Sequence, residues 1–232
     1  MQQSRCRWTA IHFILVLLMG TVWGLSLEAQ VVPQPKAGDP LNTLNASQLE
    51  RFLLGKTQFL RSFSEPEGLG PGFNQDSCAS CHAVPIGGTS PITVTRFGTA
   101  DKGAPFDPMD AEGGSLLQAN AISTECLEVV PATATIIADR ITPSILGAGL
   151  VEAIDNADIE ALQASGGTVH WVPVLEDPTA PLTVGRFGWK AQLATLMSFS
   201  GDATLMEMGI TNSILPLENA PNGDTTLLPL CD

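Results

Sequence analysis

The run Cys78-Ala79-Ser80-Cys81-His82 constrains this chain more than any other feature of its sequence. On one helical turn, positions i, i+3 and i+4 lie on the same face, so the two sulfurs and the imidazole would point the same way. This spacing lets both thiols bond to the vinyl groups of one haem while the imidazole meets the iron. A thioredoxin-type dithiol would need a βαβ context, and a zinc site would need a second Cys or His pair; the sequence shows neither. We therefore predict one covalent haem c, attached through Cys78 and Cys81, with His82 as the iron ligand.

The N-terminus predicts export. Arg5 and Arg7 precede an apolar segment over residues 11–27, and Ala29 offers a cleavage point, a pattern typical of a signal peptide over residues 1–29. The alternative is an uncleaved membrane anchor, since about 17 apolar residues lie at the short limit of what spans a bilayer. We expect a periplasmic or otherwise exported protein that contacts the membrane only if the signal is retained. Export agrees with the haem prediction, because this attachment chemistry belongs outside the cytoplasm.

The charge balance excludes some partners. Lysine and arginine number 11 against 24 aspartates and glutamates, for a formal net charge of −13. Such a surface repels nucleic acid, and no cluster of basic residues argues otherwise. An acidic surface favours positively charged soluble partners, although solubility alone would also explain it.

The pattern along the chain predicts a mainly α, cytochrome c-like domain with long irregular loops. We expect a linker over residues 30–44, the haem domain over 45–212, and an irregular C-terminal tail over 213–232 that marks a truncation point. Asn45 and Gln48 suggest a capping box at the start of a helix whose apolar face, over residues 49–63, should pack on the core. Further helices are expected from residue 155 or 156 to a stop at Gly166, and over residues 190–199.

The sixth iron ligand separates a carrier from a catalyst. A Met or His there saturates the iron and leaves electron transfer, whereas an open position lets peroxide bind. The candidates are His170, Met109, Met197, Met206 and Met208. Each methionine also suits a core position, and His170 lies in a strand-like run where a structural role is equally natural.

Cys126 and Cys231 remain outside the haem motif. Two free thiols are unusual in an oxidising compartment, so the two cysteines either pair or stay as buried thiols. The sequence leaves both readings open.

Several short segments follow one another in a fixed order: LGK at 54–56, CASCH at 78–82, GGT at 87–89, RITPSILG at 140–147, GRFGWKAQ at 185–192 and EMGIT at 207–211. Together they resemble the N-terminal half of the di-haem oxidoreductases, often labelled thiol oxidoreductases, which are related to bacterial di-haem cytochrome c peroxidases. The resemblance covers roughly residues 50 to 212 and is most specific in the last two segments.

The resemblance implies a catalytic pair. In the peroxidase relatives the N-terminal haem meets hydrogen peroxide, with a Gln and a Glu on its distal side, and an external cytochrome donates electrons. By order along the chain these residues would be Gln192 and Glu207, in which the carboxylate moves a proton between the peroxide oxygens and the amide orients the substrate. Without the resemblance, both would be ordinary surface groups.

The chain departs from the family in two ways. Residues 83–169 contain no His that could serve as the resting-state distal ligand, and no second Cys-x-x-Cys-His follows the first. We therefore expect either the peroxidatic half of a peroxidase-like oxidoreductase, a monohaem electron carrier with a saturated iron, or a non-functional truncated remnant.

Overall fold

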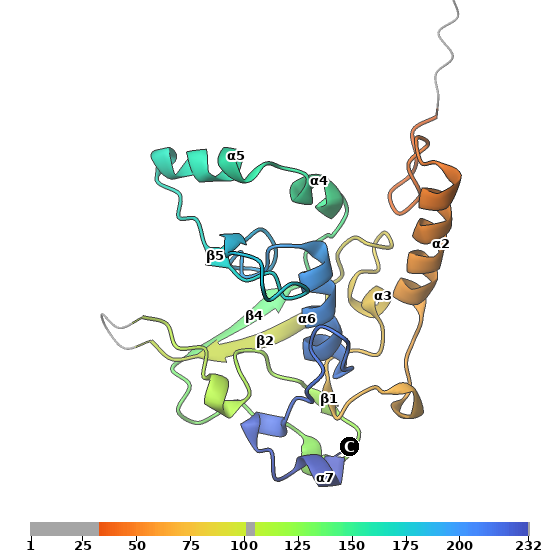
Figure 1. The fold of residues 1–232 in the computed structure, drawn as a ribbon. Helices are drawn as coiled ribbons and strands as arrows, with labels where there is room; N and C mark the ends of the chain where they lie inside the picture. Colours follow the sequence, from red (N-terminus) through yellow and green to blue (C-terminus); the bar gives the residue numbers. More distant parts are fainter. Residues whose placement is uncertain (1–32, 101–104, 232) are drawn as a thin grey trace, which may run out of the picture. The chain divides into compact units, whose positions relative to one another are not determined.

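The computed structural model describes residues 33–100 and 105–231 (Figure 1). A compact unit begins at Lys36 and is described here by itself. The predicted signal peptide over residues 1–29 lies outside the described residues. Among those that are described, no helix is both long and apolar enough to cross a bilayer.

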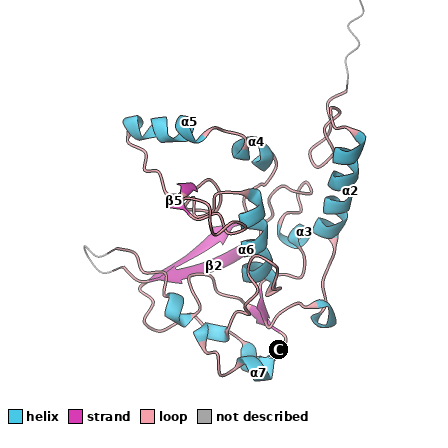
Figure 2. Ribbon diagram, viewed as in Figure 1, coloured by secondary structure: helices cyan, strands magenta, loops and turns pink. Residues whose placement is uncertain are grey.

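Short helices and short strands alternate along the chain (Figure 2). The described helices are α2 (Ala46–Leu60), α3 (Cys78–Cys81), α4 (Ala148–Glu152), α5 (Asn156–Ala161), α6 (Leu196–Met208) and α7 (Leu228–Cys231). The strands form three antiparallel pairs: β1 (Gly72–Phe73) with β3 (Asn120–Ala121), β2 (Thr93–Gly98) with β4 (Ile136–Ile141), and β5 (Trp171–Val172) with β6 (Thr183–Val184).

The predicted mainly α class is wrong. Helices account for 32% of the described residues and strands for 14%, so neither dominates. The β2–β4 ladder pairs Thr93 with Ile141 and Gly98 with Ile136, across about forty residues of chain. Threonine and isoleucine are β-branched and favour extended backbone, while frequent Gly and Pro keep the helices short.

Helix α2 forms as the sequence predicts but does not pack as expected. The Asn45 side chain accepts a hydrogen bond from the Gln48 amide at 2.9 Å, and the Gln48 side chain accepts one from the Asn45 amide at 3.0 Å, which completes the predicted capping box. No residue of α2 is buried, and Leu53 is 51% exposed. The apolar face of this helix is therefore largely uncovered.

Two other helix predictions have different outcomes. Helix α5 begins at Asn156 and its 3-10 extension ends at Gly166, whose φ of 88° is left-handed, as the Gly stop predicts. Helix α6 instead begins at Leu196, because Thr195 caps it by accepting a hydrogen bond from the Ser198 amide at 2.9 Å. Residues 190–195 form a turn, with Ala191 at a φ of 51°.

The buried core gathers around β2 and α6. Its large side chains are almost fully buried and include Phe97, Leu116, Val184, Leu205 and Met208. Gly209 ends α6 with a φ of 67° and its backbone lies directly against the β1 segment, where a Cβ would meet the Gly70 and Gly72 carbonyl oxygens at 2.6 and 2.5 Å. This close approach fixes the end of α6 on the segment that leads into α3.

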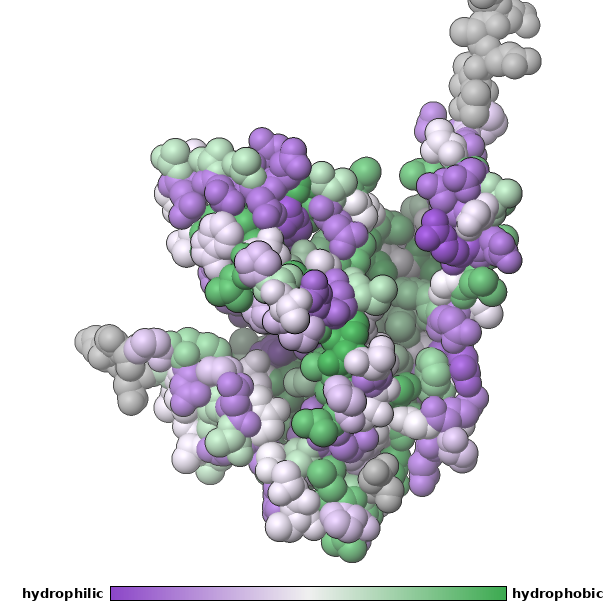
Figure 3. Space-filling view, viewed as in Figure 1, coloured by the Kyte–Doolittle hydropathy of each residue, from purple (hydrophilic) through white to green (hydrophobic). Residues whose placement is uncertain are grey.

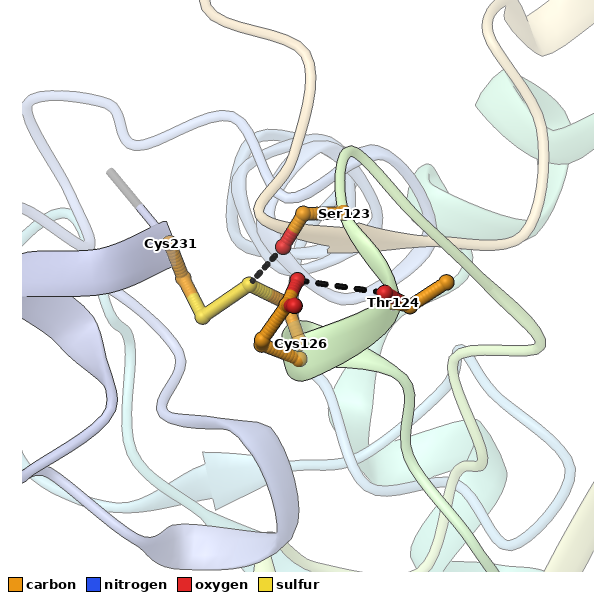
Figure 4. Close-up of a disulfide and its surroundings, with 5 residues drawn as sticks. Ser123, Thr124, Cys126 and Cys231 are labelled. Carbon is orange, nitrogen blue, oxygen red and sulfur yellow. Dashed lines mark hydrogen bonds between the residues drawn. A yellow bond between two sulfur atoms is a disulfide. The ribbon is translucent and has the colours of Figure 1, made fainter.

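Cys126 and Cys231 form a disulfide, which decides between the two readings of the sequence (Figure 4). Both cysteines are buried, and Ser123 Oγ donates a hydrogen bond to Cys126 Sγ at 2.9 Å. The bond ties α7 to the turn at residues 124–126. Residues 213–231, where we expect an irregular tail, thus include a short helix attached covalently to the rest of the unit.

Candidate functional site

Helix α3 is a single turn that places the two free thiols together. Ser77 caps it: its hydroxyl accepts a hydrogen bond from the Ser80 amide at 3.1 Å. The His82 amide closes the turn by donating to the Cys78 carbonyl at 3.0 Å. Cys78 and Cys81 are both half-buried and unpaired. The spacing that the sequence predicts for one helical face is therefore present in the structure.

The imidazole of His82 is held by the loop that follows it. His82 Nδ1 lies 3.2 Å from the Gly88 carbonyl oxygen. Because a carbonyl only accepts, Nδ1 carries the proton and donates it, and Nε2 keeps the lone pair that binds a metal. Only glycine fits at position 88, since a Cβ there would collide with the Val84 carbonyl group. Metal-binding histidines commonly use this arrangement to fix the tautomer and the ring orientation.

An aromatic side chain of α2 lies beside this turn, and other apolar side chains of α2 are exposed. The Phe59 ring lies 6.1 Å from the His82 ring, and α2 packs beside α3. Leu54 is 62% exposed and Leu60 is 44% exposed. Figure 3 shows hydrophobic surface between α2 and α6. A flat, largely apolar group such as haem would cover surface of this kind, so the residues present fit the predicted cofactor.

Direct metal binding by side chains is a separate question. Within residues 33–100 and 105–231, no group of three or more His, Cys, Asp or Glu side chains could hold a metal ion. A haem iron takes only axial ligands from the protein, so this finding does not bear on the haem prediction.

Glu207 lies in the last turn of α6, and the backbone of that turn is hydrogen-bonded to the residues before α3. The Gly70 amide donates to the Met208 carbonyl at 3.0 Å, and the Asn74 amide donates to the Glu207 carbonyl at 2.8 Å. The EMGIT segment therefore packs against the segment that leads into the Cys-x-x-Cys-His motif, although more than a hundred residues separate them in sequence.

The Glu207 carboxyl group is half-buried and hydrogen-bonded. Its Oε2 accepts a hydrogen bond from Asn74 Nδ2 at 2.9 Å. Burial raises the pKa of Glu207, and Asp202 adds to this, while the Asn74 hydrogen bond and the charge of Arg96 act against it. Burial also raises the pKa of the Cys81 thiol, and the charge of Glu207 raises it further. A group of this kind holds a proton more readily than an ordinary glutamate.

Gln192 lies in the loop before α6. Its side chain is exposed, and Oε1 accepts a hydrogen bond from the Lys190 amide at 2.8 Å. In the described part of the chain no hydrogen bond joins Gln192 to Glu207. The described hydrogen bonds therefore tie Glu207, but not Gln192, to the segment that precedes the cysteines.

Comparison of the chain with protein-family models, with curated proteins and with solved structures found no match. The resemblance to di-haem oxidoreductases accordingly stays a prediction from the quoted segments.

The candidates for a sixth iron ligand occupy different settings. Met109 and Met208 are buried in the core, whereas Met197 is 60% exposed and His170 is exposed. Met206 Sδ lies 3.5 Å from Asn219 Nδ2.

The sequence does not indicate three residues of the site. Asn74 donates a hydrogen bond to Glu207, while the charge of Arg96 lowers the pKa of Glu207 and that of Asp202 raises it. Asn74 lies only four residues before Cys78, which is the one signal that could have drawn attention to it. Arg96 and Asp202 sit in segments with no recognisable motif.

Proposed function

We propose that this chain binds one haem covalently through thioether bonds from Cys78 and Cys81, with His82 as an iron ligand, and transfers electrons. The observation that carries the proposal is the His82 imidazole, whose Nδ1 is held by Gly88 next to two free thiols on one helical turn. The haem would supply one-electron redox chemistry at its iron. The chain would orient the imidazole and exclude water through the apolar side chains of α2.

An exported location fits this role. The Cys126–Cys231 disulfide is of a kind that persists in oxidising compartments, where haem is also attached to such motifs. The acidic surface suits a positively charged electron donor such as a small cytochrome.

Covalent haem is tested first. The chain would be expressed with periplasmic haem-attachment machinery, and haem would be measured after denaturation. We expect haem to stay with the wild-type polypeptide and with the control Ser80→Ala, and to be lost from Cys78→Ser/Cys81→Ser. Loss of haem from the denatured wild-type chain would refute the proposal.

Peroxide reduction is a sharper candidate, and one observation favours it. The half-buried Glu207 carboxyl group accepts a hydrogen bond at 2.9 Å from Asn74, which lies four residues before Cys78, and burial raises its pKa. Reduction of hydrogen peroxide to two waters consumes two electrons and two protons. Glu207 would take the proton from one peroxide oxygen and return it to the departing one, while an external cytochrome supplies both electrons.

The rate of reaction of the haem-loaded chain with hydrogen peroxide separates this candidate from a carrier. Glu207→Gln is expected to lower the second-order rate constant by roughly 100-fold or more, as loss of a proton-transfer group does. The matched control is Glu50→Gln on the exposed part of α2, which should leave the rate unchanged. A low-spin spectrum indifferent to peroxide in the wild-type chain would instead indicate a carrier with a saturated iron.

A further inference from the structure

Asn74 is almost completely buried, and every polar group of the residue has a partner. Its side chain is 7% exposed. Nδ2 donates to Glu207 Oε2 at 2.9 Å, while Oδ1 accepts from the Ala119 amide at 3.1 Å. Its own amide donates to the Glu207 carbonyl, and its carbonyl accepts from Asn120 Nδ2 at 3.0 Å. The amide group therefore cannot turn without breaking buried hydrogen bonds.

The same residue belongs to the segment that builds the haem-attachment turn. Asn74 is followed by Asp76, whose Oδ1 accepts a hydrogen bond from Ser80 Oγ at 3.1 Å, and by the cap Ser77. A fixed Asn74 thus holds the Glu207 carboxyl group in register with α3.

We propose that Asn74 is a positioning residue, whose side-chain amide holds the Glu207 carboxyl group in one orientation beside the haem-attachment turn for proton transfer to peroxide. The inference rests on the proposed peroxide chemistry of Glu207. Proton transfer requires hydrogen-bond distance and alignment, so an unheld carboxyl group would transfer protons more slowly.

Asn74→Asp is the most informative variant for testing this role. Aspartate has the same shape and keeps the oxygen that accepts from Ala119, but it replaces the donor with a second carboxyl group against Glu207. The other charged groups that act on Glu207 are Arg96 on β2 and Asp202 on α6, and neither of them changes. Cys81 on α3 is a thioether in the haem-loaded chain and does not titrate. Asn120→Asp is the matched control, because Asn120 is exposed and its side chain donates a hydrogen bond to the Asn74 backbone carbonyl, not to Glu207.

Two readouts would be taken on the haem-loaded chain. The first is the rate constant with hydrogen peroxide for Asn74→Asp, Glu207→Gln and the double variant. We expect Asn74→Asp to lose about 100-fold alone, the loss typical of a misplaced catalytic group, and little more once Glu207 is already Gln. An equal loss in both backgrounds would mean that Asn74 is merely structural and would overturn the inference.

The second readout does not depend on activity. The infrared carboxyl band of Glu207 is isolated by subtracting the spectrum of the matching Glu207→Gln variant, in the wild-type, Asn74→Asp and Asn120→Asp backgrounds. We expect the band to shift in Asn74→Asp and to stay in place in Asn120→Asp. If the band shifts but the chain does not react with peroxide, the peroxide chemistry is refuted and the hydrogen bond that holds the carboxyl group stands. If the band does not shift, the inference about Asn74 is overturned even when the chain reacts with peroxide.

Discussion

At the scale of single residues, three half-buried carboxyl groups have pKa values raised mainly by burial: Glu128, Asp202 and Glu207. Each keeps its proton in the folded chain at a pH where the unfolded chain has already released it. Several exposed carboxyl groups show the opposite direction, such as Glu67, whose pKa is lowered to about 2 by hydrogen bonds from Ser64 and Arg61.

These directions predict how stability depends on pH. Above the ordinary glutamate pKa of 4.5, the folded chain binds more protons than the unfolded chain through the raised groups, so the free energy of unfolding falls as pH rises through their folded-state values. Urea unfolding between pH 5 and pH 8 should show this fall, and Glu207→Gln should make it shallower. An equally steep fall in the variant would mean that Glu207 titrates normally.

At the scale of elements, the contact between the end of α6 and the β1 segment places Glu207. Gly209 permits this contact because its left-handed φ and its lack of a Cβ let the backbones touch. The same glycine closes the helix, so one residue serves both the helix end and the packing.

Gly209→Ala should break this contact. The added Cβ would collide with the Gly70 and Gly72 carbonyl oxygens, and we expect a loss of roughly 1–3 kcal/mol in the free energy of unfolding. Gly55→Ala is the matched control: nothing lies within 4 Å of a Cβ there, and alanine in the interior of α2 should stabilise by up to about 1 kcal/mol. Chemical denaturation measures both, and equal effects would argue against the packing of α6 on β1.

At the scale of the whole molecule, the Cys126–Cys231 disulfide spans 105 residues of chain. A crosslink over so long a loop restricts the unfolded chain strongly, and native bonds of this type contribute about 2–5 kcal/mol. The loop that the bond closes contains β4 and α6, whereas β2 and α3 precede Cys126 and lie outside it. The bond therefore restricts the C-terminal half of the chain more directly than it restricts the Cys-x-x-Cys-His segment.

Cys126→Ala, Cys231→Ala and the double variant should be destabilised by the same amount, about 2–5 kcal/mol, because each removes the same bond. Urea unfolding of these variants and of the reduced wild-type chain provides the measurement. A double variant as stable as the oxidised wild-type chain would contradict the contribution of the disulfide.

The sequence predicts best what depends on neighbouring residues. The capping box of α2, the single turn of α3 and the glycine stop after α5 each arise within a few positions, and all three are present. The β2–β4 pairing and the hydrogen bond from Asn74 to Glu207 join segments that are distant in sequence and show no local pattern. For this reason the fold class predicted from the sequence is wrong, and Asn74 is not predicted as a site residue.

The uncovered face of α2 links cofactor supply to the lifetime of the chain. An isolated helix of this length is only marginally stable in water, and α2 has no buried residue to hold it. Whatever binds beside α3 and covers α2 therefore adds its binding free energy to folding. Proteases cut segments that open locally, so if the proposed haem covers α2, a chain that lacks it is expected to be cut first at α2.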